Sequence, residues 1–111
     1  MGFDYDVVVI GAGPAGSVAT ARLLQDNRKV LVLEKMVFPR FVIGESLLPH
    51  CMDFLQKVDL VSAVEKKNFQ VKTGVGFYNR TDKYQFHFND QYTHKSWPYT
   101  WQVKRADFDK A

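Results

Sequence analysis

The sequence predicts an α/β fold that opens with a Rossmann-like strand, helix and strand, and three observations support this prediction. A short apolar run at residues 7–10 leads directly into a glycine-rich turn at residues 11–16. A segment of helical length follows, and a second apolar run at residues 30–33 ends on Glu34. This order of strand, glycine turn, helix, strand and acidic residue is the one that a dinucleotide-binding site requires.

The glycine-rich turn has the spacing of a phosphate-binding turn. Gly11 permits the tight turn, Gly13 lets the backbone approach a pyrophosphate, and Gly16 lets the helix pack closely on the first strand. Pro14 suits the first turn of a helix, where no N–H is needed. The free N–H groups and the positive end of the helix dipole then face the phosphates. The whole turn is predicted to contact the dinucleotide: Gly11, Ala12, Gly13, Pro14, Ala15 and Gly16.

Glu34 is predicted to bind the ribose of that dinucleotide. It lies 18 residues after Gly16, close to the position from which a carboxylate accepts hydrogen bonds from ribose hydroxyls. A 2′-phosphate would be repelled there, so the sequence favours FAD or NAD over NADP.

Apolar residues at helical spacing predict which helix faces are covered. The first helix has a stripe that we expect to pack on the sheet: Ala15, Val18, Ala19 and Leu23. A helix after Pro49 has a second stripe: Cys51, Phe54, Leu55 and Val58. Asp59 is placed to cap a further short helix that runs to about Lys67.

The second half of the chain changes to the alternating period of strands. Tyr84, Phe86 and Phe88 alternate with polar residues, which predicts a half-buried strand. Residues 79–82 are a plausible turn that joins it to a strand over residues 75–78, and a third strand is expected over residues 99–103.

Composition excludes several classes of protein. The 111 residues are 46% hydrophobic and 24% charged, which is typical of a soluble globular domain. The net charge of +3 is spread along the chain, so nucleic-acid binding has no support. The single cysteine, Cys51, fits a core position and a reducing compartment, and no signal peptide or transmembrane run is present. We therefore predict a cytoplasmic protein, and the spacing of His50, His87 and His94 predicts no metal site.

Four further segments resemble one family. They are residues 38–40 (Phe-Pro-Arg), residues 43–49 (Ile-Gly-Glu-Ser-Leu-Leu-Pro), residues 72–77 and residues 102–109. In this order they resemble the FAD-dependent oxidoreductases that include flavin-dependent halogenases and geranylgeranyl reductase-like enzymes. These are relatives of the para-hydroxybenzoate hydroxylase-type monooxygenases.

The resemblance implies FAD as the cofactor, a small organic molecule as the substrate and NAD(P)H as a possible external electron donor. The glycine turn would bind the pyrophosphate, Glu34 the adenosine ribose, and Arg40 and Arg105 would lie along the cofactor. Three more residues are implied as cofactor contacts: Lys35, Ser46 and Gln102. Read from the residues alone, Arg40 can equally be a solvated loop residue and Ser46 a helix cap.

Lys72 is the catalytic candidate. In flavin-dependent halogenases a lysine before a similar strand is associated with carrying the oxidised halide to the substrate. A lysine amine is a nucleophile when deprotonated and a hydrogen-bond donor when charged. Lysine at a strand edge also serves simply to keep that edge from pairing. The two-tryptophan signature of halogenases, G-W-x-W-x-I-P, is absent, and the tryptophans in residues 97–101 have another spacing.

The sequence thus predicts the N-terminal part of a three-layer, Rossmann-like FAD-binding domain with a β-rich insertion after the first crossover. Residues 1–111 are expected to be a piece of a longer enzyme, to contain no second domain and to have no turnover alone. Two alternatives stay open, a dehydrogenase that uses NAD and a non-enzymatic nucleotide-binding module. The sequence does not predict the substrate, the choice between hydroxylation, halogenation and reduction, or the oligomeric state.

Overall fold

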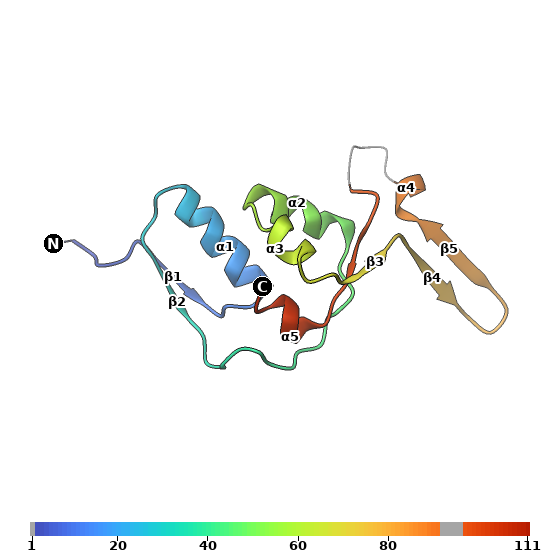
Figure 1. The fold of residues 1–111 in the computed structure, drawn as a ribbon, viewed down its shortest axis with the longest axis horizontal. Helices are drawn as coiled ribbons and strands as arrows, with labels where there is room; N and C mark the ends of the chain where they lie inside the picture. Colours follow the sequence, from blue (N-terminus) through green and yellow to red (C-terminus); the bar gives the residue numbers. More distant parts are fainter. Residues whose placement is uncertain (1, 92–96) are drawn as a thin grey trace.

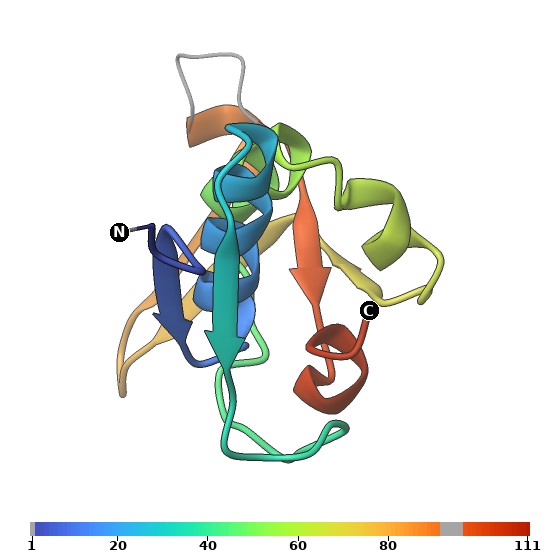
Figure 2. The same cartoon turned by 90° about the vertical axis from the view of Figure 1, so that its left-hand side faces the viewer.

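The computed structural model of the chain describes residues 2–91 and 97–111. Strand β1 (Val7–Ile10), helix α1 (Pro14–Gln25) and strand β2 (Val30–Leu33) form the predicted first unit. β1 and β2 are parallel, with Val7 opposite Val30 and Ile10 opposite Leu33. Helix α1 covers one face of this two-stranded sheet, as Figure 2 shows. The predicted βαβ unit is therefore confirmed.

The predicted packing of α1 is only partly right. Ala15 and Ala19 are exposed, and Ala15 and Val18 border an apolar cavity of about 330 Å³ between α1 and the next helix, not the sheet. The predicted close packing of Gly16 on β1 is confirmed, because a Cβ added to Gly16 would lie 3.4 Å from Val9 Cγ1. The other face of the sheet is open among the described residues, with Ile10 86% exposed.

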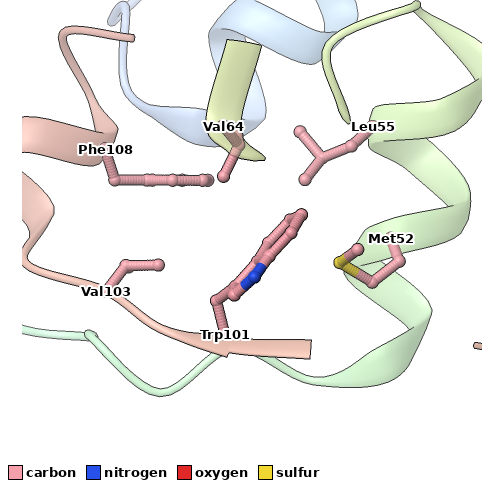
Figure 3. Close-up of a cluster of buried hydrophobic side chains, with 6 residues drawn as sticks. All are labelled: Met52, Leu55, Val64, Trp101, Val103 and Phe108. Carbon is pink, nitrogen blue, oxygen red and sulfur yellow. The ribbon is translucent and has the colours of Figure 1, made fainter. Parts of the chain in front are cut away.

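The main hydrophobic core lies beside this unit, between helices α2 (Pro49–Lys57), α3 (Val61–Glu65) and α5 (Arg105–Phe108). Figure 3 shows the Trp101 ring in the middle of this cluster. The predicted apolar stripe of α2 is partly right: Leu55 and Val58 are buried, whereas Phe54 is 44% exposed, Cys51 is only half-buried, and the fully buried Met52 was not predicted. The reason is that the core lies on the Met52 and Leu55 side, while Cys51 and Phe54 border the apolar cavity. The cluster consists of Met52, Leu55, Val64, Trp101, Val103 and Phe108.

Two antiparallel pairs follow in the second half of the chain. Strand β3 (Gln70–Lys72) pairs with β6 (Thr100–Gln102), and β4 (Gly74–Tyr78) pairs with β5 (Lys83–His87) in a hairpin that projects from the body (Figure 1). The predicted strands and turn are confirmed. The predicted half-burial of β5 is wrong, since all its residues are exposed, and buried Phe88 begins helix α4 (Phe88–Gln91) instead of extending the strand.

Two predicted helix caps are also wrong. Leu60 is the N-cap of α3, because Asp59 takes a left-handed conformation with φ of 60° before it. Leu48 is the N-cap of α2, and Ser46 lies in an isolated antiparallel bridge with Gln102.

The remaining expectations concern membranes and metals. Among the described residues, none of the helices has the length and apolar character needed to cross a membrane. His50 Nδ1 is 3.0 Å from an Asp53 carboxylate oxygen, His87 is an exposed residue of β5, and His94 lies outside the described residues.

Candidate functional site

A positive φ at Gly11 and a close backbone contact at Gly16 shape the glycine turn. Gly11 has a φ of +101°, and its N–H donates to the Leu33 carbonyl over 2.7 Å, which ties the turn to the end of β2. A Cβ on Gly16 would overlap the Gly11 carbonyl oxygen. Gly13 is the N-cap of α1 and gives the helix no side-chain cap. Among the described residues no side chain caps this end of α1, so the N–H groups that follow Pro14 are available to a ligand.

Glu34 is fixed against this turn by two backbone hydrogen bonds. Ala12 N–H donates to Oε2 and Met36 N–H donates to Oε1, each over 2.9 Å. These two hydrogen bonds, and then the charge of Arg40, hold the pKa of Glu34 below its ordinary value of 4.5, although burial acts in the opposite direction. The carboxylate is thus ionised at neutral pH and is held between the glycine turn and the loop after β2. The Lys35 backbone N–H also favours the charged form of Glu34, while the Lys35 side chain is exposed.

The Arg40 guanidinium lies beside the glycine turn, close to Glu34 and Asp109. Its Nη2 is 3.8 Å from Glu34 Oε2 and 3.8 Å from Asp109 Oδ2, and its guanidinium carbon lies 4.7 Å from the centre of the Phe38 ring. The Nε atom is buried and has no hydrogen-bond partner among the described residues. A Cβ on Gly13 would lie 3.2 Å from Arg40 Nη2, so the guanidinium packs directly against the glycine turn. The sequence-based alternative of a solvated loop arginine is wrong, since the side chain is only 14% exposed.

Arg105 is held by its own helix and by the segment of residues 43–47. Its Nε and Nη2 donate to Asp109 over 2.7 and 3.1 Å, and its Nη1 donates to the carbonyls of Ile43 and Gly44 over 3.1 and 3.3 Å. The Asp109 side chain is completely buried. Our sequence analysis did not single out Asp109, although its position four residues after Arg105 on a helix is a recognisable signal for an ion pair.

Lys72 meets Ser46 at the other end of that segment. Lys72 Nζ donates to Ser46 Oγ over 2.7 Å and to the Leu47 carbonyl over 3.0 Å, and it lies 5.5 Å from the centre of the Phe88 ring. Segment 43–47 runs along β6: Val103 N–H donates to the Glu45 carbonyl over 2.7 Å.

The site residues thus form two groups joined by segment 43–47. One group contains the glycine turn, Glu34, Arg40 and Arg105, and the other contains Ser46 and Lys72 with Gln102 opposite Ser46. Within residues 2–91 and 97–111, the exposed side chain of Lys35 makes no hydrogen bond or ion pair with either group. The arrangement offers a glycine turn at a helix N-terminus, an ionised carboxylate beside it and an amine in a fixed position.

Known proteins are similar to the chain over nearly its whole length. A family model described as tryptophan halogenase matches residues 6–110. The flavin-dependent halogenase armH3 of Armillaria mellea is 40% identical over 104 residues, which are 94% of this chain and 20% of that relative. A 1H-pyrrole-2-carbonyl-[peptidyl-carrier protein] brominase of Pseudoalteromonas luteoviolacea is 38% identical over 96% of this chain and 25% of its own length.

Solved structures give the same picture of the fold. A flavoprotein/dehydrogenase from Cytophaga hutchinsonii has a TM-score of 0.90 at 48% identity, over 96% of this chain and 26% of that one. The flavin-dependent halogenase CmlS has a TM-score of 0.84 at 36% identity, over 94% of this chain and 19% of that one. The chain therefore spans between 19% and 26% of the length of these four proteins.

Proposed function

The chain belongs to the tryptophan halogenase family, and we propose that it is the FAD-binding part of a flavin-dependent halogenase that acts on a small organic substrate. The family and the α/β fold class predicted from the sequence are confirmed. We further propose that residues 1–111 form the N-terminal part of the FAD-binding domain, because the relatives are about four to five times as long.

The position of Glu34 carries this proposal. A carboxylate bound to the N–H of Ala12 stands at the glycine turn with its charge retained, where it accepts hydrogen bonds from a ribose. Arg40 lies beside it with a buried Nε that has no partner among the described residues, and its Nη2 lies 3.2 Å from the position of a Gly13 Cβ, so a phosphate bound at this glycine would meet the guanidinium. The donor set, a helix N-terminus and an arginine, suits the pyrophosphate of FAD.

The residues of this chain bind and orient. When bound and reduced, FAD supplies the reduction of oxygen through which a halide ion is oxidised. The turn at Gly11–Gly16 holds the pyrophosphate, Glu34 holds the adenosine ribose, and Arg40 neutralises the phosphate charge. Ser46 accepts a hydrogen bond from Lys72, and Gln102 lies opposite Ser46 in a β-bridge, so we keep both as proposed cofactor contacts. We also keep Lys35, whose backbone N–H interacts with Glu34.

Lys72 is the proposed catalytic residue. Its Nζ is held by Ser46 Oγ and by the Leu47 carbonyl, so the amine has a fixed position without a carboxylate partner in the described residues. An amine in such a position is able either to donate a hydrogen bond to a hypohalous acid or, when deprotonated, to attack its halogen, so that a nitrogen–halogen bond forms as the halogen–oxygen bond breaks and hydroxide leaves. Either role delivers the halogen to the substrate from one defined point.

The test uses the protein at its natural length. We expect yellow protein that releases FAD and that, with a flavin reductant, oxygen and bromide, forms brominated product from a panel of indoles, pyrroles and phenols. Lys72→Ala should abolish product and keep the flavin spectrum, whereas Lys67→Ala, at an exposed lysine after α3, should change neither. Colourless protein that takes up no added FAD would contradict the proposal, and so would full bromination by the Lys72→Ala variant.

A flavoprotein dehydrogenase is the second candidate. The observation in its favour is the similarity to the Cytophaga hutchinsonii flavoprotein/dehydrogenase, whose identity to this chain is higher than that of CmlS. This candidate predicts anaerobic bleaching of the flavin by an organic substrate with no need for halide. The same test distinguishes the two, because halide dependence of product formation belongs only to the halogenase. NAD(P)H as external donor and a cytoplasmic location stay predictions.

A further inference from the structure

Asp109 is a buried carboxylate that no part of the proposed function uses. Its side chain has no exposed surface, yet it contacts two arginines of the proposed FAD site. Arg105 approaches it with two parallel donors, Nε at 2.7 Å and Nη2 at 3.1 Å, and Arg40 Nη2 lies 3.8 Å away. A buried charge is costly unless it is paired, so this carboxylate and the two cations depend on one another.

The contacts of Arg105 make it a support for the backbone and leave little of it for a ligand. Arginine has five N–H donors. Nε and one Nη2 donor contact Asp109, and Nη1 reaches the carbonyls of Ile43 and Gly44. Gly44 has a φ of +103°, and a Cβ there would lie 3.1 Å from Arg105 Nη1, so the guanidinium and this turn fit closely together. Asp109 thereby fixes the segment that leads on to Ser46.

The contacts of Arg40 are different. Both of its carboxylate partners are 3.8 Å away, its Nε has no partner in the described part of the chain, and its Nη1 reaches only the Met36 sulfur at 3.7 Å. Such donors are available to an anionic ligand. The negative charges of Glu34 and Asp109 on either side keep this guanidinium beside Gly13.

We propose that Asp109 is a positioning residue of the FAD site. It holds Arg40 where the pyrophosphate binds, and it turns Arg105 onto the carbonyls of residues 43 and 44, so that Arg40 binds the cofactor directly and Arg105 acts through the backbone. This inference rests on the proposed FAD site and adds a residue that does not itself touch the cofactor.

The experiment is FAD titration of the natural-length protein, followed by flavin fluorescence, with the thermal unfolding of each apoprotein measured in parallel. Asp109→Asn keeps the size of the side chain and removes its charge, and Asp107→Asn removes an exposed charge from the same helix. We expect the Kd for FAD to rise at least about tenfold in Asp109→Asn, as for loss of a hydrogen bond between charged groups, and to change by less than about twofold in Asp107→Asn.

The outcomes separate the two proposals. Wild-type protein that binds no FAD refutes the proposed function. Wild-type protein that binds FAD, with Asp109→Asn binding as tightly as Asp107→Asn, overturns the positioning role even if the melting temperature falls. If Asp109→Asn does not fold, Arg105→Lys serves instead, because it keeps the charge beside Asp109 and loses the paired donors and the carbonyl contacts. A tenfold or greater rise in its Kd supports the inference, and an unchanged Kd overturns it.

Discussion

Two alanine substitutions in the glycine turn, only three positions apart, should affect different properties: Gly16→Ala should lower stability, and Gly13→Ala should lower FAD affinity. In Gly16→Ala the new Cβ overlaps the Gly11 carbonyl oxygen and lies 3.0 Å from the Gly11 carbonyl carbon. Both atoms belong to the backbone of a turn fixed by the hydrogen bond from Gly11 N–H to the Leu33 carbonyl, so they cannot yield without moving α1 or β1. In Gly13→Ala the nearest atom is Arg40 Nη2, at 3.2 Å, which is the far end of a flexible side chain.

The magnitudes follow from these contacts. The overlap is with backbone atoms, so we take the upper end of the overpacking cost, about 3 kcal/mol; alanine in place of a helical glycine returns up to about 1 kcal/mol, so Gly16→Ala should lower the free energy of unfolding by about 2–3 kcal/mol. Gly13→Ala needs no strained backbone, since Gly13 has a φ of −70°, and its stability should stay within about 0.5 kcal/mol of wild type. Its methyl group nevertheless fills the space for the pyrophosphate, so FAD affinity should fall by at least about tenfold.

Urea unfolding of the apoproteins and FAD titration measure the two effects separately. Gly16→Ala should shift the urea midpoint down, and Gly13→Ala should raise the Kd for FAD with an unchanged midpoint. A Gly16→Ala protein as stable as wild type would refute the steric reasoning. Tight FAD binding by Gly13→Ala would refute the position assigned to the pyrophosphate.

Three further predictions concern single side chains. Because the folded-state pKa of Glu34 is lowered, its charge stabilises the fold above the ordinary pKa of 4.5, and this contribution is lost as pH falls through the lower folded pKa. In urea unfolding, the stability difference between wild type and Glu34→Gln should therefore shrink below about pH 4.5. A stability difference that is independent of pH would contradict this prediction. Ser46→Ala removes the 2.7 Å hydrogen bond to Lys72 and should lower kcat about tenfold with at most a few-fold rise in the Kd for FAD, whereas Ser46→Thr and the exposed Ser62→Ala should stay near wild type. Thr100 is fully buried, and its hydroxyl has no partner among the described residues, so Thr100→Val should raise the unfolding free energy by about 1 kcal/mol; a loss of stability in calorimetry would indicate a partner for that hydroxyl.

The first half of the site could be predicted because its signals are local. The turn from Gly11 to Gly16 needs small residues at fixed spacing, and Glu34 follows directly after the strand that lies beside it. Strand β2 is parallel to β1 and in register, so its last residue must lie at the same edge of the sheet as the turn. A few positions in sequence therefore determine the geometry.

The helix faces could not be predicted in the same way. The apolar stripes on α1 and α2 are wide enough to pack against more than one element. Which side of each helix is buried depends on the position of Trp101 and Phe108, which come from the end of the chain. For α2 this placed Met52 in the core and left Phe54 partly exposed. Similarly, β5 has the alternation of a half-buried strand, but its hairpin projects from the body, so no described element covers its aromatic face.

The second half of the site depends on contacts between residues that are far apart in sequence. Lys72 and Ser46 are 26 residues apart, and Arg105 reaches the carbonyl of residue 43 across 62 positions. Both contacts form on segment 43–47, which has no strand pattern of its own and is held in place by β6 and by Arg105. A change at Asp109 would therefore act directly on Arg40 and Arg105, through Arg105 on the carbonyls of residues 43 and 44, and only through that segment on Lys72. Asp109→Asn is therefore expected to raise the Kd for FAD more than Ser46→Ala does, because Asp109 contacts the two arginines directly and Ser46 contacts only the lysine.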